Sequence, residues 1–330
     1  MEQREIRRIG RDVSVVGLGT WQLGADWGEV DEDEALAVLD AAVDSGVTFL
    51  DTADVYGDGR SERLIGSFLG QLGPDRAAGI LVATKMGRRA RQDPAEFTLD
   101  NFRVWTDRSR ANLGVDTLDL VQLHCPPTPV FSSGAVYDAL DTLVEEGRVA
   151  AYGVSVETCE EALAAIARPH VASVQIILNA FRRKPLERVL PAAREAGVGI
   201  IARVPLASGL LSGRYRRDTV FGADDHRTYN RRGESFDVGE TFSGVDYEVG
   251  VEAAAEFAAL VPEGATPAQA ALRWVVQQEG VTSVIPGART PEQARANSEA
   301  ARLPALPEVT LKAVEELYDR RIRGLVHDRW

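Results

Sequence analysis

Short apolar runs alternate with amphipathic segments along most of the chain. Apolar side chains recur with helical spacing in residues 33–44 and 61–69, and runs rich in Val, Ile and Leu occur at 47–50 and 80–83. Helical spacing predicts a helix with one buried face, and a short apolar run between turn residues is typical of a buried strand. The pattern predicts strands at 13–18, 47–50, 80–83, 118–123, 149–154, 171–177, 198–204 and 281–285, and helices at 33–44, 61–69, 99–112, 135–146, 158–167, 186–196, 249–259, 267–278, 291–301 and 308–320.

The order of these elements predicts an α/β protein with the architecture of a (β/α)8 TIM barrel. Strands that are apolar throughout are typical of parallel strands covered on both faces, and alternating strands and helices favour a parallel sheet. Eight such units suggest that the sheet closes. A hairpin at residues 6–14, with Gly10 near its turn, precedes the repeats, and extra helices follow the eighth strand. We expect residues 1–330 to form one barrel domain.

A doubly wound sheet is the rival architecture. Its dinucleotide-binding fingerprint needs a third glycine in the first turn, and the segment from Gly17 to Gln22 reads GLGTWQ. The chain also contains no P-loop sequence for nucleoside triphosphates. The barrel is therefore the favoured interpretation.

One long segment, residues 214–246, interrupts the alternation. A structureless stretch of this size in a compact domain is usually functional or mobile. We expect it to lie as a loop over the C-terminal face of the barrel, and a disordered insertion is the alternative, given its charged and Gly-rich composition. Its ring-bearing and basic residues include Phe221, His226, Arg227, Tyr229 and Phe242.

Composition narrows the classes of partner. Acidic residues outnumber basic residues by 50 to 37, and no stretch of Lys and Arg forms the footprint of a nucleic-acid-binding protein. Cys125 and Cys159 are the only cysteines, so the sequence predicts neither a disulfide scaffold nor a CxxC metal site. No run of about 18 apolar residues or apolar leader occurs. We expect a cytoplasmic protein without nucleic-acid or membrane partners, and no metal.

Reactive side chains lie where the predicted strands end. The active site of a (β/α)8 barrel lies at the C-terminal ends of its strands. Lys85 is one of only three lysines among the 37 basic residues, and it directly follows a strand. Burying such groups without partners would cost several kcal/mol, so we expect them to form a site. The polar residues at or just after strand ends are Asp51, Tyr56, Lys85, His124, Ser155 and Gln175.

These groups suit the reduction of a carbonyl. Tyr56 can donate a proton, and its pKa of about 10 should fall beside the Lys85 cation. Asp51 would keep Lys85 charged and oriented, and a neutral His124 could donate a hydrogen bond to a carbonyl oxygen. A rival chemistry uses Lys85 as a Schiff-base nucleophile, which needs a neutral amine in an apolar pocket. Borohydride trapping would distinguish the two.

The same residues resemble the aldo-keto reductase family. The segment FLDTADVYG at residues 49–57, followed by SERLIG at 61–66, is similar to the family's most recognisable motif. The family's tetrad of Asp, Tyr, Lys and His matches Asp51, Tyr56, Lys85 and His124 in order and spacing, and the resemblance covers nearly the whole chain.

The resemblance implies an extended NADP(H) across the C-terminal face, with the nicotinamide over the tetrad. Ser155 and Gln175 would bind the carboxamide. Arg289, with Gln293 and Asn297, would hold the 2′-phosphate at a helix N-terminus; otherwise Arg289 is an ordinary surface arginine. The implied cofactor contacts are Gly19, Thr20, Trp21, Asp51, Ser155, Gln175, Arg203, Val204, Leu206, Ser208, Gly209, Leu210, Arg214, Gly287, Arg289, Gln293 and Asn297.

Two positions depart from the family pattern. Val156 stands where many members have Asn, so one carboxamide contact is missing or comes from elsewhere. Arg203 stands where an aromatic residue commonly stacks on the nicotinamide. A planar guanidinium can stack similarly or bind the cofactor phosphates.

The resemblance also implies a substrate pocket formed by Trp21, Val55, Tyr56 and His124. Trp27 and Trp105 are further candidates, although a core role suits Trp105 equally well. Cys125 either senses oxidation or only packs. The predicted function is the NADPH-dependent reduction of aldehydes or ketones, reversible as alcohol oxidation, on small-molecule substrates. The alternative is a redox-sensing regulatory subunit that has the same fold and binds the cofactor.

Overall fold

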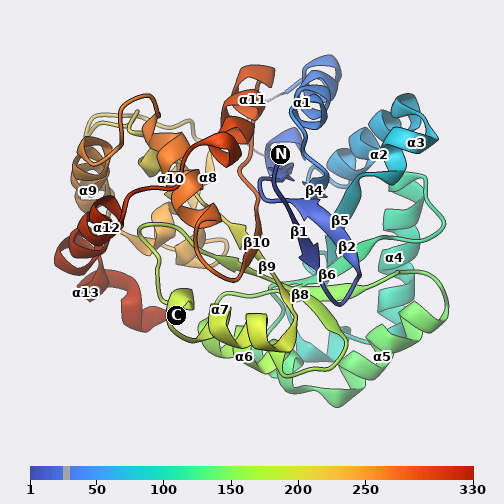
Figure 1. Cartoon of the computed structure of the whole chain (residues 1–330). Coiled ribbons are helices and arrows are strands. Elements are labelled where there is room, and N and C mark those ends of the chain that lie inside the picture. Colours follow the sequence, from blue (N-terminus) through green and yellow to red (C-terminus); the bar gives the residue numbers. More distant parts are fainter. Residues whose placement is uncertain (25–29) are drawn as a thin grey trace.

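The chain forms a barrel of parallel strands surrounded by helices (Figure 1). The computed structural model describes residues 1–24 and 30–330. Eight strands pair in sequence order, each parallel to the next, and parallel bridges from Val16 to Val284 and from Gly19 to Gly287 join the first strand to the last. The (β/α)8 prediction is therefore confirmed. The barrel strands are β3 (Leu18–Gly19), β4 (Phe49–Asp51), β5 (Leu81–Met86), β6 (Leu120–His124), β7 (Tyr152–Ser155), β8 (Val171–Ile177), β9 (Gly199–Arg203) and β10 (Val281–Val284).

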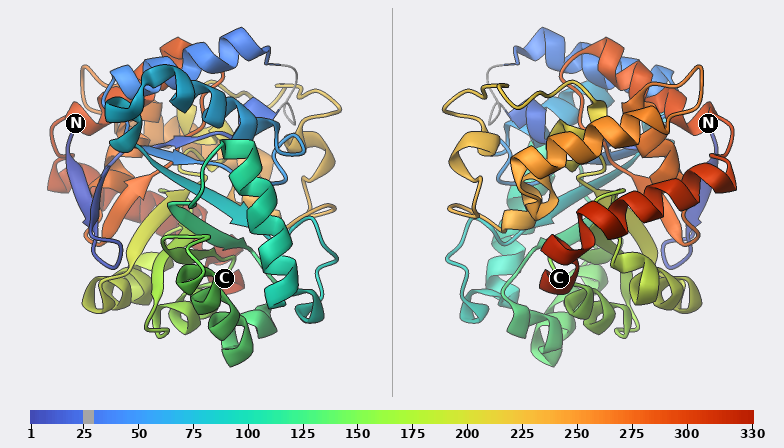
Figure 2. Two further views of the ribbon diagram at one scale, coloured as in Figure 1. Left: turned by 90° about the vertical axis from the view of Figure 1, so that its right-hand side faces the viewer. Right: turned by 90° about the vertical axis from the view of Figure 1, so that its left-hand side faces the viewer.

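Helices cover the outside of the barrel on all sides (Figure 2). Each predicted helix occurs with its ends shifted by a few residues, and the short helices α3, α8 and α13 are additional. Helices α9 and α12 are additional to the repeat of one helix after each strand, and they pack against each other. The helices are α1 (Glu32–Asp44), α2 (Arg60–Leu72), α3 (Pro74–Ala78), α4 (Leu99–Leu113), α5 (Gly134–Glu145), α6 (Cys159–Ile166), α7 (Pro185–Ala196), α8 (His226–Tyr229), α9 (Tyr247–Ala259), α10 (Pro267–Val276), α11 (Pro291–Glu299), α12 (Glu308–Arg321) and α13 (Arg323–Val326).

One predicted strand was wrong as a single element. Residues 13–18 divide between the hairpin strand β2 (Arg11–Ser14) and the barrel strand β3. Gly17 lies between them, where a Cβ atom would stand 2.8 Å from the carbonyl oxygen of Phe49. The chain crosses the neighbouring strand too closely there for a side chain. A continuous apolar pattern therefore hid the change from hairpin to barrel.

The predicted hairpin closes the N-terminal end of the barrel. Strand β1 (Gln3–Ile6) pairs with β2 in antiparallel register, and Gly10 takes a positive φ of 70° in the turn. Ile6 and Val13 are fully buried against the inward-facing side chains of the barrel, among them Phe49 and Leu120. The hairpin thus fills the end of the barrel opposite the strand ends that carry the polar residues.

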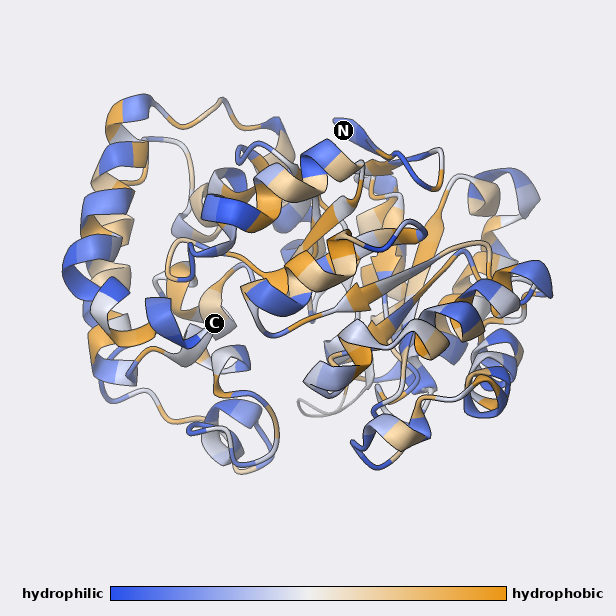
Figure 3. Cartoon of the chain, turned by 90° about the horizontal axis from the view of Figure 1, so that it is seen from below, coloured by the Kyte–Doolittle hydropathy of each residue, from blue (hydrophilic) through white to orange (hydrophobic). Residues whose placement is uncertain are grey.

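A second apolar layer lies between the barrel and its helices. Figure 3 shows the hydrophobic strands at the centre and hydrophilic residues along the outer faces of the helices. Helix α1 begins after Asp31, whose side chain accepts a hydrogen bond from the backbone N–H of Glu34 and so caps the helix. Across the described ranges 1–24 and 30–330, no helix has both the length and the apolar character needed to cross a lipid bilayer.

The segment 214–246 is held by buried polar contacts. Asn230 donates to Thr241 and accepts the backbone N–H groups of Ser235 and Phe236. Asn179, which follows β8, donates to the hydroxyl of Ser243. These bonds favour a packed covering loop over a disordered insertion.

Candidate active site

A cleft of about 610 Å³ opens at the C-terminal ends of the strands. Its size lies within the usual range for small-molecule and cofactor sites, roughly 300–1,000 Å³. The cleft runs from the strand ends to the N-terminal ends of α10 and α11. The predicted site residues that line it are Gly19, Thr20, Trp21, Asp51, Tyr56, His124, Ser155, Gln175, Arg203, Val204, Leu206, Ser208, Gly209, Arg214, Gly287, Arg289, Gln293 and Asn297.

The predicted tetrad is assembled at one end of the cleft. Lys85, only 1% exposed, donates from Nζ to Asp51 Oδ1 at 2.5 Å and to the carbonyl oxygen of Thr52 at 2.9 Å. Its Nζ is also 3.5 Å from Tyr56 Oη. The Tyr56 and His124 rings meet edge to face with centroids 5.9 Å apart. Lys85 therefore lies behind Tyr56, which faces the cleft.

The C-terminal ends of three neighbouring parallel strands bring these residues together. Asp51 ends β4, Lys85 lies one residue before the end of β5 and His124 ends β6, and the strands are staggered, so that Asp51 is paired with Ala83 and Lys85 with Gln122. Tyr56 follows β4 in a tight turn at Gly57, which has a φ of 56°. A Cβ atom on Gly57 would lie 2.0 Å from the carbonyl oxygen of Gly24, so only glycine fits the turn that places Tyr56.

Two buried amides orient Asp51. Gln175 donates from Nε2 to Asp51 Oδ2 at 2.7 Å, and Gln122 donates to the same oxygen at 3.3 Å. Gln122 was not predicted, although a glutamine inside an otherwise apolar strand was an available signal. Gln175 was predicted to bind the nicotinamide carboxamide, and it also bonds to Asp51.

The electrostatic environment keeps Lys85 charged. Burial opposes its charge, but the attraction of Asp51 exceeds this effect, so the pKa of Lys85 is raised. A Schiff-base nucleophile needs a neutral amine. The geometry therefore favours an ion pair behind Tyr56 over amine catalysis.

Tyr56 and His124 both remain neutral near pH 7. The pKa of Tyr56 is raised, because burial outweighs the lowering by Lys85, so the expected fall in this pKa was wrong. The pKa of His124 lies well below its ordinary value, because burial and then the charges of Arg88, Lys85 and Arg203 oppose protonation. Both groups can therefore act as hydrogen-bond donors, as the predicted chemistry requires.

Aromatic rings frame the predicted substrate side. Trp21 stacks with Tyr56 at 6.0 Å between ring centroids, and lies 5.4 Å from His226 and 5.9 Å from Phe236 of the covering segment. The segment 214–246 thus contributes to the wall beside Tyr56.

Besides Lys85, which lies behind Tyr56, four further predicted positions do not line the cleft or are not described. Val55 is half-buried away from it, and Leu210 is fully buried, against Gly250. Trp105 packs on Phe97 and Phe102, which supports its core interpretation. Trp27 lies outside the described residues.

The far end of the cleft lies at the N-terminus of α11. The backbone N–H of Arg289 donates to the Gln293 side chain at 2.8 Å, and Asn297 donates to the carbonyl oxygen of Gly287 at 3.2 Å. The Arg289 side chain is exposed and makes no ion pair with a described residue. A guanidinium at a helix N-terminus is well placed for a phosphate. Gln22, Tyr215 and the stretch 266–269 also line the cleft and were not predicted, whereas Arg227, which lines it too, belongs to the segment expected to cover it.

The loop after β9 takes an unusual backbone path along the cleft. Val204, Ala207 and Ser208 have positive φ angles of 52°, 48° and 54°. Ser208 Oγ donates to the carbonyl oxygen of Glu240 at 3.0 Å and accepts the backbone N–H of Phe242 at 3.0 Å. The strained loop therefore anchors the covering segment, and strain of this kind is common at binding sites.

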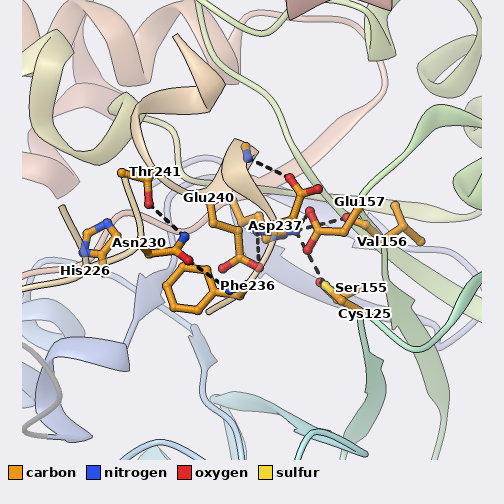
Figure 4. Close-up of polar contacts among 12 residues, drawn as sticks. Cys125, Ser155, Val156, Glu157, His226, Asn230, Phe236, Asp237, Glu240 and Thr241 are labelled. Atoms are coloured by element: carbon orange, nitrogen blue, oxygen red, sulfur yellow. Dashed lines mark hydrogen bonds and ion pairs between the residues drawn. The ribbon is translucent and has the colours of Figure 1, made fainter. Parts of the chain in front are cut away.

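A buried charged cluster was not predicted as such. Glu157 and Glu240 lie side by side near Cys125 (Figure 4), and Arg88 and Arg203 pair with both carboxylates. Ligand atoms of Cys125, Glu157 and Glu240 lie within 4.8 Å of one another, but the two guanidinium groups already balance the carboxylates. Arg88 and Glu157 follow strand ends by two residues, which was an available signal.

This cluster bears on two alternatives that the sequence left open, one for Arg203 and one for Cys125. The Arg203 guanidinium donates to the Val156 carbonyl oxygen at 3.1 Å and to Glu157 at 2.9 Å, so it is not free to hold cofactor phosphates. Burial raises the pKa of Cys125 to about 12. Oxidation needs a thiolate, so the packing role of Cys125 is favoured over a redox sensor.

A barrel with this tetrad at the mouth defines a class of oxidoreductases that act on carbonyl groups. The sequence profile of the Aldo/keto reductase family matches residues 15–319. The chain belongs to this family of NAD(P)-dependent oxidoreductases.

Individual relatives agree over nearly the full length. The aldo-keto reductase YhdN of Bacillus subtilis is 29% identical over 91% of this chain and 88% of its own. The glycerol dehydrogenase AKR11B4 of Gluconobacter oxydans is similar in structure with a TM-score of 0.76 and 29% identity, over 97% of this chain and 96% of that chain. An aldo-keto reductase of Klebsiella pneumoniae, solved with NADPH, has a TM-score of 0.69 and 25% identity over 96% of each chain.

Proposed function

We propose that this protein reduces aldehydes or ketones to alcohols with NADPH, and catalyses the reverse oxidation. The observation that carries the proposal is the position of Tyr56: its ring faces the cleft, and its hydroxyl lies 3.5 Å from the Lys85 ammonium that Asp51 holds. The bound cofactor supplies a hydride from nicotinamide C4.

The side chains of the tetrad have separate tasks. Tyr56 Oη gives its proton to the carbonyl oxygen as negative charge develops there. His124, neutral at pH 7, donates a hydrogen bond to the same oxygen and so stabilises that charge. The Lys85–Asp51 pair stabilises the tyrosinate that remains, because the ammonium lies within hydrogen-bonding distance of Tyr56 Oη. Solvent water then returns a proton to Tyr56 Oη.

The cleft fits an extended dinucleotide phosphate. Ser155 and Gln175 lie at the tetrad end, where they would hold the carboxamide, and Gly209 and Ser208 line the middle. The exposed Arg289 guanidinium at the opposite end would hold the 2′-phosphate. The absence of an ion pair to any described carboxylate leaves this charge available, which favours NADPH over NADH.

The experiment is a spectrophotometric assay. Purified protein is mixed with NADPH, or separately with NADH, and with a panel of aldehydes, ketones and keto sugars, and absorbance is followed at the nicotinamide band. Consumption of NADPH that Tyr56→Phe abolishes supports the proposal. Tight NADPH binding without consumption of any panel compound favours the regulatory-subunit alternative.

A further inference from the structure

Two members of the charged cluster, Arg203 and Glu240, line the cleft, and Arg88 and Glu157 pair with them. Arg203 ends β9 and is paired in register with Ile177 of β8. Its Nη2 atom donates to Glu157 at 2.9 Å, and its Nη1 atom is 3.7 Å from Glu240. Arg88 contacts Glu240 at 2.8 Å and Glu157 at 3.5 Å. Arg203 therefore forms ion pairs with both Glu157 and Glu240.

These ion pairs join parts of the chain that are distant in sequence. Glu157 follows β7, and Glu240 belongs to the covering segment, which Ser208 anchors through the Glu240 carbonyl oxygen. Figure 4 shows the two carboxylates close to each other. Arg203 is only 8% exposed, and its Nε–H has no partner among the described residues. This buried donor is open to an acceptor from water or from a bound molecule.

Arg203 lines the same end of the cleft as Tyr56 and His124. A nicotinamide that gives hydride to a carbonyl held by these two residues has to lie within a few ångströms of that carbonyl, and so beside Arg203. The charge of Arg203 acts at this distance, because it contributes to the lowered pKa of His124.

The two forms of the cofactor differ in charge at this ring. The reduced nicotinamide is neutral, and the oxidised ring carries one positive charge. The two carboxylates balance the two guanidinium groups over the cluster as a whole, but the charges of the cluster that act on His124 in the cleft are those of Arg88 and Arg203. A positive charge on this side of a poorly solvated wall opposes the oxidised form more than the reduced form. An aromatic side chain, the kind that the family commonly has at this position, carries no such charge.

We propose that Arg203, held by Glu157 and Glu240, is a specificity-determining residue that makes the protein bind NADPH in preference to NADP+. This inference rests on the proposed function, since it needs the nicotinamide beside Tyr56. Arg203 also donates to the carbonyl oxygen of Val156, so the two positions that depart from the family pattern are in direct contact. The preference favours release of oxidised cofactor after each reduction.

Equilibrium titrations with NADPH and with NADP+ test the proposal without turnover. The measured quantity is the ratio of the two dissociation constants, Kd(NADP+) over Kd(NADPH), followed by fluorescence or calorimetry at about pH 8.5. Burial raises the pKa of Glu157, although Arg203 opposes this effect. The titrations need the Glu157 carboxylate in its charged form, and the pH is chosen for that reason.

Three variants separate charge from shape. Arg203→Met keeps much of the side-chain volume and should lower the ratio about tenfold, which corresponds to about 1.4 kcal/mol. Arg203→Lys keeps the charge and should leave the ratio within about twofold of the wild-type value. Glu157→Gln removes a negative charge beside Arg203 and should raise the ratio, so two neighbouring substitutions give changes of opposite sign.

The outcomes are distinct. If Arg203→Met weakens both forms equally and the ratio stays unchanged, Arg203 only shapes the site and the proposal fails. If Arg203→Met does not fold, a fall or no change in the ratio for Glu157→Gln overturns the proposal by itself. Failure of the wild-type protein to bind either nicotinamide form contradicts the proposed function instead.

Discussion

Each tetrad side chain depends on its immediate partners. Asp51 accepts bonds from Lys85, Gln175 and Gln122, so its two oxygens are fixed, and Lys85 is fixed in turn. Tyr56 is placed by the Gly57 turn and by the ring of Trp21. A substitution that removes a single reactive atom should therefore leave the positions of the other tetrad side chains unchanged.

Tyr56→Phe removes only the phenolic oxygen. We expect carbonyl reduction to fall by a factor of roughly 10² to 10⁴, the usual contribution of a general acid. The NADPH dissociation constant should stay within about twofold of the wild-type value, because the ring and its stacking remain. Steady-state kinetics and a binding titration check the two parts. Undiminished turnover would show that another group supplies the proton.

Arg289→Ala removes the exposed cation at the N-terminus of α11. A hydrogen bond to a charged group contributes about 1.5–3 kcal/mol, so NADPH should bind about 10- to 100-fold more weakly. Affinity for NADH, which lacks the 2′-phosphate, should change little. Arg295→Ala is the matched control, since Arg295 lies on the same helix but does not line the cleft. An equal loss for both cofactors would place the phosphate elsewhere.

Ionisation of the Asp54 carboxyl group affects the stability of the folded protein. Both its carboxylate oxygens are buried without a described partner, and burial, with Glu62, raises the pKa of Asp54 to about 7. An acid whose pKa is higher in the folded state than in the unfolded state, about 3.9, loses stability as pH rises between these values. Asp54→Asn should therefore be more stable than wild type by about 2–4 kcal/mol at pH 8. The gain should shrink toward pH 4.

Urea denaturation between pH 4 and pH 8 measures this difference. Asp58→Asn is a suitable control, because Asp58 is exposed and pairs with Arg89 and Arg108. A pH-independent gap between Asp54→Asn and wild type would mean that the carboxyl does not titrate in this range.

At the scale of residues, the sequence predicted the groups that chemistry requires at strand ends. Asp51, Lys85 and His124 stood out because each follows or ends an apolar strand, where a charged group needs a reason. Glu240 did not stand out, because nothing in its neighbourhood shows that it meets Arg88, 152 residues away. Contacts of that kind arise only when the covering segment has folded.

Helices that are long enough to show a clear apolar period were predictable, and short helices were not. Helices α4 and α12 extend over several turns, so their apolar spacing is visible in the sequence. Helices α3 and α8 have 5 and 4 residues, which is too short for a period of 3.6 to show. The path of segment 214–246 depends on distant bonds such as Asn179 to Ser243, which no local pattern reveals.

Ser208→Ala tests how the covering segment is attached. The hydroxyl bonds to Glu240 and Phe242 of this segment and lies 3.5 Å from Nε2 of His226, and a hydrogen bond contributes about 1 kcal/mol. The variant should therefore show faster proteolysis within 214–246 and faster release of NADPH. Ser212→Ala is the control, since the Ser212 hydroxyl bonds to Gly209 of its own loop and, in the segment, only to the first residue, Arg214. Equal cleavage rates in the two variants would contradict the anchoring role of Ser208.

Over the whole molecule, the fold was predictable because eight repeated units leave few alternatives. Alternating strands and helices favour parallel neighbours, and the antiparallel hairpin stood apart through its early Gly10 turn. The exact boundary between hairpin and barrel was not predictable, because the apolar pattern continues through Gly17 while the chain changes its neighbours.

Ile6→Ala tests the hairpin as part of the barrel core. Ile6 is fully buried against the inward-facing residues, and truncation of a buried Ile to Ala usually costs about 2–5 kcal/mol. We expect the free energy of unfolding to fall by this amount, with NADPH affinity unchanged below the melting transition. Ile9→Ala, at a half-buried position of the turn, should cost much less. Similar losses for both would mean that the hairpin does not complete the core.

The hairpin has a practical consequence. It closes the end of the barrel opposite the cleft, so its turn at residues 7–10 faces away from every residue that lines the mouth. Attachment of the protein to a solid support through this turn would orient the mouth toward the surrounding solution. Immobilised molecules of this kind would then admit dissolved reagents as freely as unattached ones.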